Sequence, residues 1–189
     1  MSLVFYYAPW SSATTTHWAL EELGVPYEKV KLDLAAKDTK KPAFLALNPN
    51  GKVPLLVHDG VPIFESVAIL AHLGETFGVE KGLFPAPGIA RAQAFQWLAW
   101  MNVSLGASAS RFVQGGDATE ARALLEILDR HLRGRTWMVG ESFTLVDLHL
   151  AGGMMWIARL GIDTSGLPDL DAWLARAKDR PALARVMSA

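Results

Sequence analysis

Two hydrophobic periodicities divide the chain. Residues 1–77 contain short apolar and β-branched runs broken by turn residues, whereas from residue 89 onward the apolar positions recur at helical spacing. The segment 78–88 holds Pro85, Pro87 and three glycines, a composition typical of a linker. We therefore predict a first domain over 1–77, a linker over 78–88 and a second domain over 89–189.

The first domain is predicted to combine strands and helices. Residues 3–7 form a strand, and residues 27–34 alternate apolar and charged side chains, which predicts a half-buried second strand that includes Leu34. A helix that ends at Gly24 separates the two strands, so they should lie parallel. The remaining elements are a short helix over 42–47, a hairpin of 53–58 and 61–64 around Asp59-Gly60, and a helix capped by Ser66 that runs to 77. The predicted order is βαβαββα, an α/β domain.

The second domain is predicted to be all-helical. Within it, Thr144 and Asp147 are spaced as a capping box, with Asp in place of the commoner Glu or Gln, and this motif marks the start of a buried helix. Helical spacing covers residues 89–113, 118–132, 145–160 and 170–178.

Net charge and hydrophobicity exclude some classes of binding partner for this protein. The net charge is −1, which gives no electrostatic basis for binding nucleic acid or an anionic membrane surface. No apolar run approaches the ~20 residues that span a bilayer, and residues 1–9 lack the features of a signal peptide, so we expect a cytoplasmic protein. Hydrophobic residues make up 51% of the chain, and the surplus apolar surface suggests burial in a dimer.

The chain has no cysteine. This excludes disulfides, zinc-thiolate sites and a nucleophilic thiol of the protein itself, so any thiol chemistry must come from a ligand. The histidines are scattered without a pair at the i, i+4 spacing of zinc ligands, and we predict no metal site.

The segment 48–56 carries the most informative local chemistry. Pro54 begins a hairpin strand, and its nitrogen has no hydrogen to donate to the sheet. A cis peptide bond costs little free energy only before a proline. A cis bond would turn the N–H and C=O of Val53 toward a ligand that docks like an added strand. The alternative is a tight turn that only starts a strand.

Two helix N-termini carry hydroxyl groups. Glu65 and Ser66 place a carboxylate and a hydroxyl beside free N–H groups, which suits a ligand bearing both an ammonium and a carboxylate. At Ser11 and Ser12 a thiol would have its pKa lowered by the helix dipole and by hydroxyl donation. At both places the alternative role is ordinary helix capping.

Taken together, these motifs resemble the cytosolic glutathione transferases of bacterial type, across nearly the whole chain. The resemblance rests on the order and spacing of the serine-containing turn, residues 19–27, residues 48–56, Glu65-Ser66 and residues 143–147. It implies a thioredoxin-like first domain that holds glutathione as co-substrate, an all-helical second domain that forms the pocket of the second substrate, and no metal.

The resemblance also implies roles for the glutathione-binding residues. Val53, next to cis-Pro54, would pair with the cysteinyl backbone of glutathione, and Glu65 with Ser66 would hold its γ-glutamyl end. Lys52 would approach the glycyl carboxylate.

The thiol would point at the serine turn. Ser11 lies where similar serine-type transferases place the hydroxyl, and Ser12 lies where the cysteine-type bacterial members have Cys; we rank Ser11 first. Tyr6 is an alternative donor. Where the cysteine-type enzymes carry a His-Lys pair, this chain has Gly106-Ala107.

The resemblance thus implies a detoxifying transferase, acting as a homodimer, that adds glutathione to a small hydrophobic electrophile. Alternatives are a glutathione-dependent isomerase, peroxidase or dehalogenase, and a non-catalytic binding module of the same fold. The apolar pocket would be lined from two helices by Met154, Met155, Trp156, Trp97, Trp100, Met101 and Phe112; plain core packing or dimer contact is the alternative for each.

Overall fold

A four-stranded mixed sheet forms the N-terminal half of the protein, whose computed structural model describes residues 1–188. β1 (Leu3–Tyr7) lies between β2 (Glu28–Lys31), to which it is parallel, and β3 (Leu55–His58), to which it is antiparallel; β4 (Val61–Phe64) follows at the edge. The helices of this half are α1 (Ala13–Leu23), the 3-10 helix η1 (Asp38–Lys40), α2 (Pro42–Leu45), α3 (Ser66–Leu73) and the π-helix η2 (Gly74–Gly78). The predicted order βαβαββα is confirmed, and the arrangement is thioredoxin-like.

Several details of the first domain differ from the predictions. The helix predicted to run to residue 77 ends as α3 at Leu73 and continues as the π-helical segment η2, and β3 begins at Leu55 instead of residue 53. The strand predicted over 27–34 ends at Lys31, and Leu34 is 49% exposed, because β2 is an edge strand and the chain turns away after it. Ser66 does not cap α3: Glu65 occupies the N-cap position, and the Ser66 hydroxyl accepts a hydrogen bond from Asn102 instead.

The second half is all-helical, as predicted. The structure divides the helix predicted over 89–113 with a π-helical segment, η3, and adds α9, which the hydrophobic spacing did not indicate. No helix within residues 1–188 is long and apolar enough to cross a membrane. The elements are α4 (Ile89–Trp100), η3 (Met101–Gly106), α5 (Ala107–Val113), α6 (Thr119–Leu132), α7 (Leu145–Leu160), α8 (Pro168–Lys178) and α9 (Pro181–Met187).

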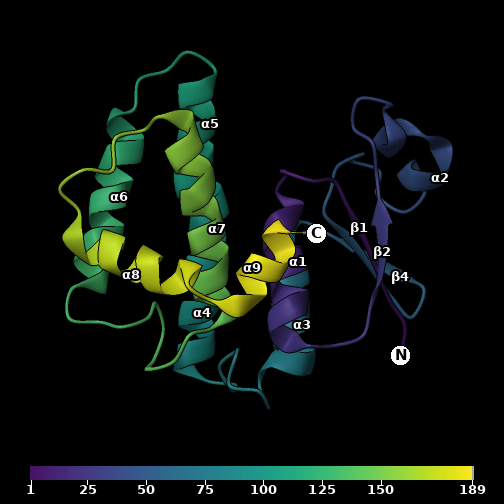
Figure 1. The fold of residues 1–189 in the computed structure, drawn as a ribbon, viewed down its shortest axis with the longest axis horizontal. Helices are drawn as coiled ribbons and strands as arrows, with labels where there is room; N and C mark the ends of the chain where they lie inside the picture. The colour runs from purple at the N-terminus through teal and green to yellow at the C-terminus, as the bar shows by residue number, and fades with distance from the viewer. Residues whose placement is uncertain (189) are drawn as a thin grey trace.

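The C-terminal helix returns to the N-terminal domain and packs against α1 (Figure 1). At its start, the Arg180 guanidinium donates to both carboxylate oxygens of Glu22, at 2.9 and 2.6 Å, and Glu22 is nearly buried. Arg185 donates to Glu21 at 2.8 Å. Two-point contacts between guanidinium and carboxylate are the stronger and more directional kind of ion pair, so α9 is fixed to α1.

A buried carboxylate organises the start of α7. Asp147 accepts hydrogen bonds from the Met138 N–H at 2.8 Å, the Thr144 N–H at 2.9 Å and hydroxyl at 3.1 Å, and the Trp173 indole N–H at 2.9 Å. The Thr144 hydroxyl in turn accepts from the Val146 N–H, so the predicted capping box is confirmed. The same carboxylate therefore joins α7, α8 and the loop before them.

Two adjacent glycines let α7 approach its neighbours closely. A Cβ on Gly152 would lie 2.3 Å from the Thr15 methyl group of α1, and a Cβ on Gly153 would lie 2.2 Å from the terminal methyl of Met101 in η3. Both glycines line the cleft between the two domains. The missing side chain of Gly152 thus lets α7 approach α1, and that of Gly153 lets it approach η3.

Replacing each of these two glycines by alanine should lower the free energy of unfolding by different amounts. We expect Gly152→Ala to lower the free energy of unfolding by about 1–3 kcal/mol, because the methyl of buried, β-branched Thr15 has little room to move. Gly153→Ala should cost less than about 1 kcal/mol, since the flexible Met101 side chain can turn aside and alanine favours a helix. Urea unfolding of the two variants measures this; equal losses would contradict the explanation.

Candidate functional site

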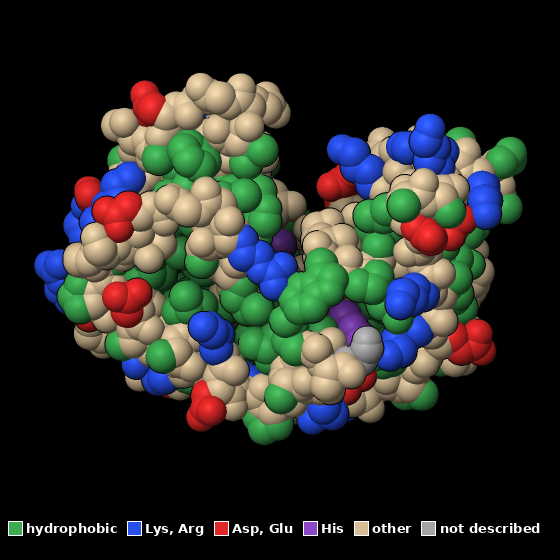
Figure 2. Space-filling model, turned by 45° about the horizontal axis from the view of Figure 1, so that its top comes forward, with side chains coloured by type: hydrophobic (Ala, Val, Ile, Leu, Met, Phe, Trp, Pro, Cys, Tyr) green, Lys and Arg blue, Asp and Glu red, His purple; other side chains and the backbone are tan. Residues whose placement is uncertain are grey.

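A cleft of about 570 Å³ lies between the two domains. Figure 2 shows the molecule hollowed between its two halves, with hydrophobic side chains in the hollow. The cleft is lined by the start of α1, by Lys52 and Ser66, and by residues of η3, α5, α7 and the end of α9. Of the predicted site residues, it brings together Ser11, Ser12, Lys52 and Ser66.

The predicted residues Val53, Pro54, Glu65 and Tyr6 do not line this cleft. The Val53–Pro54 bond is cis, and the Val53 carbonyl faces the start of α1, where it accepts a hydrogen bond from the Ser12 hydroxyl at 3.0 Å. Glu65 is exposed and has a φ of 70°, which is unfavourable for a residue with a side chain. Tyr6 lies away from the cleft and contacts the Phe44 ring edge-on at 5.9 Å.

A network of hydrogen bonds holds the loop that carries Lys52. The Asn48 side chain donates to the Lys52 carbonyl at 2.8 Å and accepts from the Asn50 N–H at 3.1 Å. The Lys40 ammonium donates to the Gly51 carbonyl at 2.9 Å. Asn48 is buried, so the loop that leads to Val53 is fixed from within the domain.

The two serines at the start of α1 have different surroundings. The half-buried Ser11 hydroxyl donates to the Ala8 carbonyl at 2.7 Å and accepts from the Ala13 N–H at 3.1 Å, so its proton already has a partner within the turn. Ser12 is exposed, and the only hydrogen bond of its hydroxyl within residues 1–188 is the one it donates to the Val53 carbonyl. Of the two, Ser12 is the freer to turn toward a ligand.

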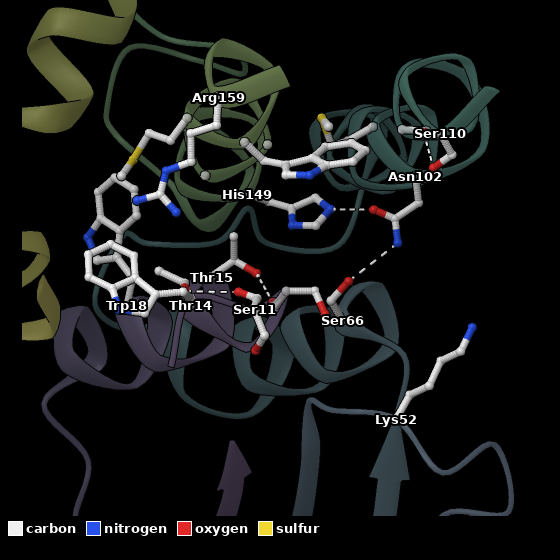
Figure 3. A pocket seen from close by; sticks show the side chains of 18 of the residues that line it. Ser11, Thr14, Thr15, Trp18, Lys52, Ser66, Asn102, Ser110, His149 and Arg159 are labelled. Atoms are coloured by element: carbon white, nitrogen blue, oxygen red, sulfur yellow. Dashed lines mark hydrogen bonds between the residues drawn. The ribbon is translucent and has the colours of Figure 1, made fainter. Parts of the chain in front are cut away.

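A chain of hydrogen bonds crosses between the domains beside the cleft (Figure 3). His149 of α7 lies 2.9 Å from the Asn102 side-chain oxygen, and the Asn102 amide donates to the Ser66 hydroxyl at 3.3 Å. Since the amide oxygen is an acceptor, the proton of His149 must be on Nε2. Ser66 accepts from Asn102, so its own hydroxyl proton remains available to a ligand.

His149 is held neutral by its surroundings. It is fully buried, and burial lowers the pKa of His149 to about 4. Its other ring nitrogen, Nδ1, has no hydrogen-bond partner in residues 1–188. At neutral pH it therefore acts as an uncharged hydrogen-bond donor to Asn102.

Sequence reasoning missed His149, Asn102 and Arg159, which all line the cleft. His149 and Asn102 are 47 residues apart, and no local motif indicates that they meet. Among the described residues, no group of three or more His, Cys, Asp or Glu side chains could hold a metal ion.

The predicted apolar wall is present in part. Met101, Met155 and Trp156 line the cleft. Met154 and Trp97 are instead buried in the core, at 1% and 7% exposure, and Trp100 and Phe112 pack against that core. Met154, Met155 and Trp156 are consecutive and so point in different directions from α7: Met154 enters the core, and Trp156 is 38% exposed.

Comparison with known families identifies the class of protein. Residues 2–75 match the family described as Glutathione S-transferase, N-terminal domain, and residues 116–181 match Glutathione S-transferase, C-terminal domain. The chain is 32% identical over 186 residues to glutathione S-transferase GST-4.5 of Xanthomonas campestris, covering 90% of each protein. This chain belongs to the glutathione S-transferase family, whose enzymes use glutathione as co-substrate.

Other relatives and solved structures support the same family. A disulfide-bond oxidoreductase of Escherichia coli, YfcG, is 29% identical, with 96% of this chain and 93% of that protein covered. A sphingomonad glutathione S-transferase solved in complex with glutathione is 29% identical with a TM-score of 0.87, covering 98% of this chain and 97% of that one. The predicted family and both predicted domain folds are thus confirmed.

Neutral His149 predicts a pH dependence of stability. Because its pKa is about 4 in the folded protein and about 6.5 when unfolded, the unfolded chain binds a proton that the folded chain does not. This contribution to stability is complete above about pH 6.5 and is lost as the pH falls toward 4, by about 2 kcal/mol between pH 7 and pH 5.

Urea unfolding of the parent and of His149→Gln at pH 7 and pH 5 measures this contribution. His17, His72 and His131 also have lowered pKa values, and they contribute equally to the pH dependence of stability in both proteins. The difference between the two proteins therefore reports His149. The variant should lose about 2 kcal/mol less than the parent on acidification. Identical losses would show that His149 titrates normally.

Proposed function

We propose that this protein binds glutathione in the cleft and adds its thiolate to an apolar electrophile. In this proposal Val53, beside Pro54, pairs with the cysteinyl backbone, Glu65 and Ser66 hold the γ-glutamyl end, and Lys52 approaches the glycyl carboxylate. The observation that carries the proposal is that one cleft joins Lys52, Ser66 and the serine turn at the start of α1.

The geometry of the three binding groups supports this orientation. In the view of Figure 3, Ser11, Ser66 and Lys52 follow one another in this order along one side of the cleft. A tripeptide laid from Lys52 to Ser66 would pass the Val53 carbonyl, and its thiol would reach the start of α1. The positive end of the α1 dipole favours the thiolate there.

Between the two serines, the structure favours Ser12 as the donor to the thiolate, ahead of Ser11. Ser11 would have to break its bond to the Ala8 carbonyl, whereas the Ser12 hydroxyl bonds the Val53 carbonyl, the group expected to accept from glutathione itself. We infer that glutathione takes over this carbonyl and that the Ser12 hydroxyl turns to the sulfur. Ser11 then serves mainly to hold the turn before α1, through its bonds with the Ala8 carbonyl and the Ala13 N–H.

Apolar side chains form the wall for the second substrate. Trp10, Met155, Trp156 and Met187 line the cleft around the serine turn. Trp10 is 67% exposed and has a φ of 57°, so a large ring is presented to solvent by a strained backbone. Such a surface would bind the flat, apolar body of an electrophile next to the thiolate.

The roles of the two serines predict different effects of replacing each by alanine. In Ser12→Ala the pKa of bound glutathione should rise by about one unit and turnover near neutral pH should fall roughly tenfold, with little change in glutathione affinity. Ser11→Ala should change this pKa less and mainly lower stability, by about 1 kcal/mol. Calorimetric titration of glutathione and the ultraviolet thiolate band against pH measure both quantities.

Two results would contradict this assignment. If only Ser11→Ala raises the thiol pKa, Ser11 is the donor. If glutathione does not bind at millimolar concentration, the cleft serves another ligand and the non-catalytic alternative is favoured. Isomerase, peroxidase and dehalogenase substrates, tested on the same samples, separate the alternative reactions.

We also propose that the protein is a homodimer. α4 and η3 carry exposed apolar side chains, with Ile89 83%, Phe95 37% and Val103 72% exposed. Val61 of the edge strand β4 is 62% exposed. Exposed apolar residues at several positions along consecutive helical segments are typical of an interface.

Sedimentation equilibrium at micromolar concentration tests the dimer. We expect twice the chain mass for the parent, and a shift toward the monomer in Val103→Glu, because a charge would be buried without a partner. Val113→Glu, at an exposed position at the end of α5, is the matched control. A monomeric parent would overturn the proposal.

A further inference from the structure

The guanidinium of Arg159 lines the cleft and forms no ion pair with another residue of the described range 1–188. Arg159 lies in the last turn of α7, and its guanidinium carbon is 4.6 Å from the centroid of the Trp10 ring. In residues 1–188 it has neither a hydrogen bond nor a carboxylate within ion-pair distance. By contrast, Arg180 and Arg185 of the same domain are paired with Glu22 and Glu21.

None of the described residues that line the cleft offers a carboxylate to pair with this guanidinium. The charged side chains among the described residues that line the cleft are Lys52 and Arg159, and none is acidic. In Figure 3, Arg159 extends from α7 at one end of the cleft and Lys52 lies at the other. Lys52 is therefore placed for one end of glutathione, whereas Arg159 lies beyond the serine turn, where the second substrate would bind.

Stacking on Trp10 leaves the edge of the guanidinium free. A guanidinium that lies over an aromatic ring still presents its N–H groups in its own plane, and these match the two oxygens of a carboxylate. Trp10, Met155 and Trp156 surround this position with apolar surface. The surroundings thus combine an aromatic binding surface with one fixed positive charge.

We propose that Arg159 binds a carboxylate on the second substrate, so that the enzyme favours aromatic electrophiles that carry an acidic group. This inference rests on the proposed function and specifies its substrate class. In a chloronitroarene, the glutathione sulfur forms a bond to the ring carbon, the carbon–chlorine bond breaks, and chloride leaves with the bonding electrons. The thiol proton has already passed to solvent, and the carboxylate held by Arg159 takes no part in the bond changes.

The test compares a charged and a neutral substrate of the same shape. We would measure kcat/KM for para-chloro-meta-nitrobenzoate and for para-chloro-meta-nitrobenzamide with the parent, Arg159→Gln and Arg176→Gln. Arg176 is the matched control, since it lies over the Trp137 ring at 5.9 Å and does not line the cleft. Comparing the ratio of the two substrates between proteins cancels their different intrinsic reactivity.

We expect the benzoate-to-benzamide ratio to fall roughly tenfold in Arg159→Gln, the size of effect typical of a charge-assisted hydrogen bond. In Arg176→Gln the ratio should match the parent. An unchanged ratio in Arg159→Gln would overturn the proposal while leaving the transferase function in place.

A binding measurement distinguishes failure of the proposed function from failure of this inference. If the parent turns over neither substrate, calorimetry with the two glutathione conjugates, carboxylate and carboxamide, still tests Arg159. The parent should bind the carboxylate conjugate roughly tenfold more tightly, and this preference should disappear in Arg159→Gln. No preference in the parent, or no binding of the carboxylate conjugate, would overturn the proposal.

Discussion

The hydrogen bonds to the buried Asp147 carboxylate fix the start of α7, and the shape of the cleft depends on that helix. Four donors from Met138, Thr144 and Trp173 converge on this group, so α7, α8 and the preceding loop share one polar centre. Because a buried carboxylate without its donors would be very costly, these elements hold together or come apart as a unit. From this fixed start, α7 presents His149, Gly152 and Arg159 to the cleft in successive turns.

Because α7 and α9 both pack against α1, this helix forms one wall of the cleft. Gly152 lets α7 approach Thr15, and α9 is held against α1 by ion pairs with Glu21 and Glu22. The N-terminus of α1, which carries the serine turn, is thereby placed between the domains. The His149–Asn102–Ser66 chain adds a second link across the same boundary, so the proposed glutathione end of the cleft is coupled to the helical domain.

The positively charged side chains of the cleft lie at its two ends. His149 remains uncharged because burial lowers its pKa, so it orients Asn102 without adding positive charge. The two cationic groups, Lys52 and Arg159, lie at opposite ends. With a thiolate between them, the cleft would bind an anionic co-substrate at one end and, at the other, the acidic group that Arg159 is proposed to select.

The sequence by itself determined the βαβαββα order, the helical second domain, the capping box at Thr144 and the family. Each of these depends on residues near one another in the chain: alternation in strands, helical spacing, the Asp59-Gly60 turn, and motifs such as Val53-Pro54. Only the tertiary structure decided how the serine hydroxyls are bonded, that Ser66 accepts from Asn102, and that Arg159 faces the cleft. These contacts join residues far apart in sequence, and they depend on how closely helices pack, which the hydrophobic pattern of one chain does not specify.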